Sequence, residues 1–84
     1  MKTIKEYQNE IVNFLEQYGS VDIKNGDGFV QFTVGDISIM LGFKGATYVA
    51  GGVKHGQMVI ITELERYGLT PLFNQIKREI VWRN

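Results

Sequence analysis

The chain has 84 residues, of which 44% are hydrophobic and 21% charged, with nine basic and nine acidic side chains and no cysteine. This composition predicts a single folded domain over 1–84 and excludes intrinsic disorder. The lack of cysteine excludes disulfides, thiolate metal sites and cysteine nucleophiles, and it favours a reducing, cytoplasmic setting. The N-terminal segment lacks the apolar run of a signal peptide, and no apolar stretch approaches the roughly 18 residues of a membrane span.

The first predicted element is an amphipathic helix over residues 4–18. Thr3 and Glu6 have the spacing of a capping box, in which each side chain satisfies a backbone N–H at a helix start. Gly19 is a suitable stop. Apolar residues recur at steps of three and four, which places them on one stripe: Ile4, Tyr7, Ile11, Phe14, Leu15 and Tyr18.

The hydrophobic period then changes to two, which indicates half-buried strands. Three short strands are expected at 21–24, 30–34 and 37–41, joined by turns at 25–28 and at Gly35-Asp36. Glycines at 42, 45, 51, 52 and 56 make a helix costly in the next stretch. We expect a short strand at 46–50, a glycine-rich loop at 51–56 and a further strand at 57–61.

Two short helical segments are predicted at the C-terminal end. Thr62 and Glu65 repeat the capping-box spacing, and Gly68 ends the turn that they begin. Thr70 and Pro71 then have the pattern of an N-cap followed by proline at the first helical position. The apolar stripe of the terminal helix, which reaches about residue 82, consists of Leu72, Phe73, Ile76 and Ile80.

These elements predict an α+β fold in the order α-β-β-β-β-(β)-α-α. Each helix has one stripe to bury and the meander has one apolar face, so both helices are expected on the same face of an antiparallel sheet of four to five strands. The result is a two-layer sandwich. Several apolar residues fall out of phase and are expected on the face away from the helices, where they would form an interaction or dimer surface: Phe29, Met40, Tyr48, and Met58 or Val59.

The sequence assigns no catalytic or metal-binding residue and no cofactor. The only histidine is His55, in a glycine-rich loop with no orienting partner. One histidine without cysteine cannot supply a zinc site, and Asp22, Asn25 and Asp27 lack the alternating ligands of a calcium loop. They are typical of a hairpin turn.

A short segment, Leu41-Gly42-Phe43-Lys44-Gly45, resembles the glycine loop of KH domains, which clamps a nucleic-acid backbone. KH domains hold that loop between two helices, whereas 37–41 alternates like a strand. No site residue is therefore transferred from that family.

The best surface hypothesis rests on charge distribution. Residues 1–36 carry three bases and six acids, and residues 37–84 carry six bases and three acids, so the halves have net charges of −3 and +3. The stretch 37–62 contains no acid, which suits a phosphate or an acidic partner. The candidate binding residues are Lys44, Tyr48, Lys54 and His55, together with Trp82 and Arg83 as typical interface anchors.

The sequence thus favours a non-enzymatic binding module, of the adaptor or inhibitor kind, that meets another protein through a sheet face, a strand edge or the glycine-rich loops. A homodimer through the apolar sheet face or paired edge strands is also open. The alternative is a nucleic-acid-binding regulator that uses the basic C-terminal half. The third hypothesis is a small enzyme that uses Glu63, Glu65 or His55.

Overall fold

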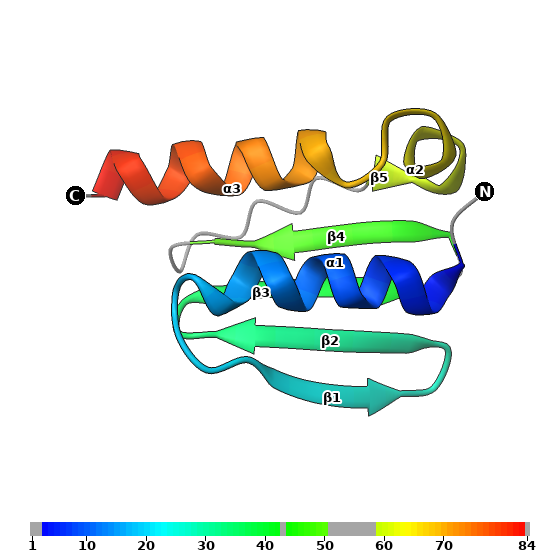
Figure 1. Ribbon diagram of the computed structural model, residues 1–84, viewed down its shortest axis with the longest axis horizontal. Helices are drawn as coiled ribbons and strands as arrows, with labels where there is room; N and C mark the ends of the chain where they lie inside the picture. Colours follow the sequence, from blue (N-terminus) through cyan, green and yellow to red (C-terminus); the bar gives the residue numbers. More distant parts are fainter. Residues whose placement is uncertain (1–2, 43, 51–58, 84) are drawn as a thin grey trace.

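The computed structural model describes residues 3–42, 44–50 and 59–83, the last three of these by their backbone only. Within these residues the chain forms a helix, five strands and two helices, and their bounds are α1 Ile4–Glu16, β1 Asp22–Gly26, β2 Phe29–Val34, β3 Ile37–Gly42, β4 Gly45–Val49, β5 Val59–Ile60, α2 Ile61–Tyr67 and α3 Thr70–Arg83. The strands form one antiparallel sheet in which each pairs with the next along the chain (Figure 1). The predicted α+β meander with flanking helices is confirmed.

Helix α1 begins where the sequence predicts. The Thr3 hydroxyl accepts a hydrogen bond from the Glu6 N–H at 3.2 Å, and the Thr3 N–H donates to the Glu6 carboxylate at 3.3 Å, which completes the capping box. The helix ends at Glu16, two residues earlier than expected, because the Tyr18 N–H turns back to the Leu15 carbonyl at 2.9 Å. None of the helices in the described part of the chain is long and apolar enough to cross a bilayer.

The first three strands follow the predicted meander with one shift. β1 extends to Gly26, so the turn contains only Asp27 and Gly28, where Gly28 has a φ of 82°. The second turn lies at Gly35-Asp36 as predicted, with a φ of 54° at Gly35. Gly42 and Gly45 pair across the hairpin between β3 and β4, which is unlike the helix–loop–helix setting of a KH glycine loop.

The transition from β5 to α2 differs from the prediction. The Ile61 N–H donates to the Lys44 carbonyl at 3.0 Å, so the strand passes directly into the helix at Ile61. The N-cap is Ile60, without a side-chain hydrogen bond, and the predicted capping box opened by Thr62 is wrong. Gly68 ends α2 with a φ of 69° and donates its N–H to the Leu64 carbonyl at 2.9 Å, as predicted.

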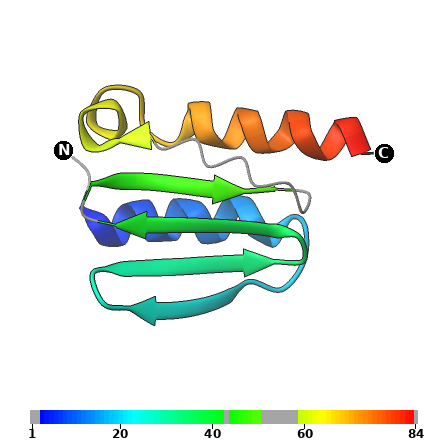
Figure 2. The ribbon, with the colours of Figure 1, turned by 180° about the vertical axis from the view of Figure 1, so that it is seen from behind.

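Helix α1 lies over the centre of one face of the sheet, whereas α2 and α3 lie along its β4 and β5 edge (Figure 1). Both C-terminal helices contact α1. The rings of Phe14 in α1 and Phe73 in α3 stack at 4.0 Å between centroids. The Tyr7 hydroxyl of α1 donates to the Leu64 carbonyl of α2 at 3.1 Å. Turned by 180°, the described chain shows a sheet with no helix in front of it, so the two-layer arrangement is confirmed (Figure 2).

The core lies between the layers. Its largest fully buried side chains come from the first helix, the two central strands and the C-terminal segment: Ile11, Leu15, Phe32, Ile39, Leu69, Leu72 and Ile76. The predicted stripes are therefore confirmed, except that Ile4, at the start of α1, is 56% exposed. It lines an open hollow together with Asn25 and Gly26 at the end of β1.

The backbone of β1 has an inner and an outer side. Gly26 and Phe29 close the two-residue turn as a hydrogen-bonded pair. Along an antiparallel ladder such pairs alternate with pairs that are not hydrogen-bonded. The N–H and C=O of Lys24 consequently face β2, whereas those of Ile23 and Asn25 face away from the sheet.

This alternation predicts how β1 tolerates proline. Lys24→Pro removes a donor to β2 and is expected to lower the free energy of unfolding by about 1–3 kcal/mol. Ile23→Pro removes a donor that faces outward and replaces a half-exposed side chain by a smaller one. It is therefore expected to lower the free energy of unfolding by about 1 kcal/mol or less. Urea unfolding of both variants measures the difference. Equal destabilisation would contradict the register given for β1.

Candidate functional site

The most accessible element of the described chain is the edge strand β1. All five of its residues are exposed, and Ile23 retains 51% of its accessible surface despite being apolar. In both ribbon views no described segment lies beyond β1 in the plane of the sheet (Figures 1 and 2). An exposed edge of this kind presents unpaired N–H and C=O groups and is a template for another strand.

The side chains of β1 divide between its two faces. Ile23 pairs with buried Phe32 and therefore lies on the helix side of the sheet. Asp22 and Lys24 pair with Thr33 and Gln31 and lie on the opposite side. The edge thus offers an apolar side chain on one face and a pair of opposite charges on the other.

The outer face of the sheet adjoins this edge. Met40 pairs with Gln31 and Thr47 on that face and is 38% exposed. Phe29 is half-buried there, and its ring lies across Gly26 so closely that a Cβ at position 26 would overlap it. The predicted outer position is confirmed for Phe29 and Met40.

For Val59 and Tyr48 the outer position is wrong. Val59 pairs with Ala46, which is fully buried, and is itself 6% exposed. Tyr48 is 2% exposed and pairs with buried Ile39 on the helix side. The physical reason is that Tyr48 points inward between two small buried residues, Ala46 in β4 and Ala50 directly after it, which leave room for the tyrosine ring under α3.

The buried Tyr48 phenol is not an accessible binding group. Burial raises its pKa above the ordinary value of 10.0, the negative charge of Glu79 raises it further, and a hydrogen bond with the Gln75 side chain acts in the opposite direction. Gln75 and Glu79 both belong to α3. Tyr48 therefore joins β4 to α3 in its neutral form.

Of the other candidate binding residues, only Lys44 has a described side chain. Lys44 is exposed at the turn before β4, and its carbonyl anchors the start of α2. Lys54 and His55, with the loop predicted at 51–56 and Met58, lie outside the described residues. Trp82 and Arg83 belong to α3, and their side chains lie outside the described part.

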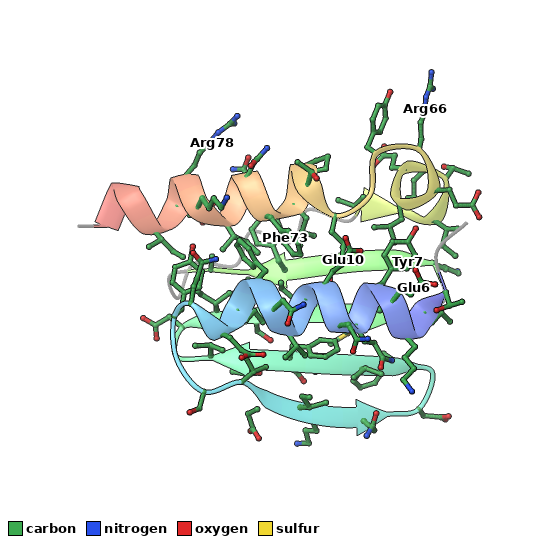
Figure 3. The ribbon with its side chains drawn as sticks, in the orientation of Figure 1. Glu6, Tyr7, Glu10, Arg66, Phe73 and Arg78 are labelled. Atoms are coloured by element: carbon green, nitrogen blue, oxygen red, sulfur yellow. The ribbon has the colours of Figure 1, made fainter. Side chains whose placement is uncertain are left out.

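A second surface, missed by the sequence reasoning, lies on the side of α2 and α3 away from the sheet. Arg66 and Arg78 project outward there (Figure 3). The Arg66 guanidinium lies 5.4 Å from the centroid of the Tyr67 ring, which is 58% exposed. Tyr67 and Arg78 also line an open hollow of about 470 Å³.

The two acidic candidates for catalysis, Glu63 and Glu65, lie in different surroundings. Glu65 lines an open hollow of about 550 Å³ with Tyr7 and Glu10, whereas Glu63 is exposed in the first turn of α2. The Ser38 hydroxyl accepts a hydrogen bond from the Gln31 amide at 2.9 Å, on the outer sheet face. Within the described residues no three His, Cys, Asp or Glu side chains gather as metal ligands would.

The Tyr48 environment predicts an alkaline limit to stability. A raised pKa means that the folded chain holds the phenolic proton when the unfolded chain has lost it. The contribution of Tyr48 to stability is therefore fully present below about pH 10 and is lost as the pH rises above that value. Tyr48→Phe should reduce this fall, as measured by urea unfolding between about pH 8 and 11. Tyr67→Phe, at an exposed phenol, is the matched control, and equal slopes in Tyr48→Phe and wild type would contradict the prediction.

Comparison with known proteins found no relative of this chain. No family model, no curated protein and no solved structure matches the chain.

Proposed function

We propose that this chain is a non-enzymatic interaction module that binds another protein by adding a strand to the β1 edge of its sheet. The observation that carries the proposal is the full exposure of β1, with the backbone groups of Ile23 and Asn25 directed away from β2. Strand addition obtains affinity from main-chain hydrogen bonds and specificity from alternate side chains. An adaptor or inhibitor role is compatible with this mode of binding.

The side chains of β1 define the partner segment. It is extended, it places an apolar residue against Ile23 on the helix side, and it carries charges complementary to Asp22 and Lys24 on the outer side. Met40 and Phe29, farther across the outer face, extend the contact where the partner chain folds over it. A cytoplasmic setting belongs to the same proposal and is supported by the absence of cysteine.

The proposal is tested by affinity capture from the native cell with three baits: the wild-type chain, Ile23→Pro and Lys5→Asp. Proline at position 23 removes the central outward donor of the edge while leaving the bonds to β2 in place. Proteins that bind the edge should be retained by the wild type and Lys5→Asp and be depleted at least about tenfold by Ile23→Pro. Mass spectrometry of the retained proteins gives the ratio.

A protein retained equally by all three baits would place the contact elsewhere on the chain and would contradict edge binding. The Lys5→Asp bait controls for the effect of a substitution as such, at an exposed residue of α1 and outside β1. Circular dichroism of each bait before use verifies that the sheet is intact.

A second candidate function, nucleic-acid binding, is supported by the Arg66, Tyr67 and Arg78 surface. Exposed aromatic rings stack on unpaired bases, and arginines contact the phosphates between them. Glu63 and Glu65 on the same short helix α2 oppose this reading, since they repel phosphate.

The nucleic-acid alternative predicts salt-dependent binding of single-stranded RNA or DNA through Tyr67. Fluorescence anisotropy with a labelled oligonucleotide of about 15 bases should show an affinity that falls steeply between about 50 and 200 mM salt. Tyr67→Ala should weaken binding about 5- to 100-fold by the loss of one stacked base. Tyr18→Ala, at a half-buried ring in the turn after α1, is the comparison. Absence of binding at 50 mM salt would eliminate the alternative.

A further inference from the structure

We infer that the strand added to β1 is β1 of a second copy of this chain, antiparallel and in register about Ile23. The two five-stranded sheets then join into one continuous sheet of ten strands. This inference rests on the proposed edge binding and names its partner. It is carried by the symmetry, the charges and the apolar surface of the five exposed residues of β1.

Symmetry limits the possible pairings. Two identical neighbouring strands that run antiparallel are related by a two-fold axis perpendicular to the sheet, so one residue of β1 must lie opposite itself. Directly opposed residues point to the same face of the sheet. The helices of both copies consequently lie on the same side, and the two outer faces form one surface.

Charge selects among these pairings. With Ile23 opposite itself, Asp22 of each copy lies opposite Lys24 of the other, which gives two favourable cross-strand pairs on the outer face. With Lys24 or Asp22 opposite itself, two like charges meet at the centre. The Ile23 register is therefore the one in which the charges of β1 complement each other.

The backbone agrees with the same register. The N–H and C=O of Ile23 face outward, so two opposed Ile23 residues exchange both hydrogen bonds across the axis. Asn25, which also faces outward, then lies opposite Val21 of the second copy. In this register the outward N–H and C=O groups of one β1 lie opposite those of the other.

The apolar surface beside the edge is covered in this arrangement. The two Ile23 side chains, each 51% exposed in the single chain, meet on the helix side of the joined sheet. Val21 of the second copy lies opposite Asn25, which lines a hollow of about 250 Å³ with the exposed Ile4. Self-association thus places an apolar side chain toward the hollow that Asn25 and Ile4 line.

A contact of one short strand is below the roughly 1,200 Å² of a standard stable interface, so the dimer is expected to be reversible. Sedimentation equilibrium of the full chain from roughly 10 μM to 1 mM should show a monomer and dimer in exchange. Asp22→Lys and Lys24→Asp each oppose like charges at both outer pairs and should weaken the dimer at least about tenfold.

The register is tested by restoring the charges. The double variant Asp22→Lys/Lys24→Asp should dimerise within about threefold of wild type, and an equimolar mixture of the two single variants should form a heterodimer. Lys5→Asp is the matched control for Lys24→Asp, with the same change of charge outside β1. A chain that remains monomeric at 1 mM, or a dimer indifferent to either single reversal, would overturn the inference.

Failure of this inference is distinguishable from failure of the proposed function. If the wild type is monomeric while Ile23→Pro still loses a captured protein, the β1 edge binds a different chain and only self-pairing is wrong. If the wild type is monomeric and Ile23→Pro retains every captured protein, both are wrong.

Discussion

The structure depends on one constraint: helices from the two ends of the described chain share a single face of one sheet. Stacking of Phe14 on Phe73 holds α1 and α3 together, and the hydrogen bond from Tyr7 to the Leu64 carbonyl joins α1 to α2. Each helix thereby completes the burial of the other as well as that of the sheet. A meander of this size could not bury its apolar face with only one of them.

The same constraint determines which surfaces stay accessible. Since the described helices cover only one face, the opposite face keeps a mixed surface of polar side chains with Phe29 and Met40. Because α2 and α3 lie along the β4 and β5 side, the protection of sheet edges is unequal, and β1 is left uncovered. Both proposals concern this uncovered edge, where main-chain groups and alternating side chains are available together.

Much of this architecture could be predicted from the sequence because its signals are local. The Thr3 and Glu6 spacing, the period-two strands and Gly68 each determine structure within a few residues, and each prediction was confirmed. The predictions that failed depend on distant neighbours. Thr62 does not open a helix because the Ile61 N–H bonds to the Lys44 carbonyl and α2 already begins at Ile61.

The candidate site was less predictable for the same reason. In β4 the alternation of Ala46 and Tyr48 with Thr47 and Val49 does not reveal the inward face of the strand, which only the docking of α3 determines. The sequence raised a strand edge as a binding surface without specifying which one. The alternation of Asp22, Ile23 and Lys24, in the first strand of a meander, is the signal that could have identified β1.

The stack of Phe14 on Phe73 also has a consequence for biosynthesis, since it joins residues 59 positions apart, whereas each strand pairs with its immediate successor. A chain emerging from the ribosome can form the hairpins and dock α1 well before α3 has been translated. Until then Phe14 and part of the apolar face of the meander remain exposed to solvent. The nascent protein therefore passes through an interval in which chaperones and unwanted neighbours compete for a surface that the finished molecule conceals.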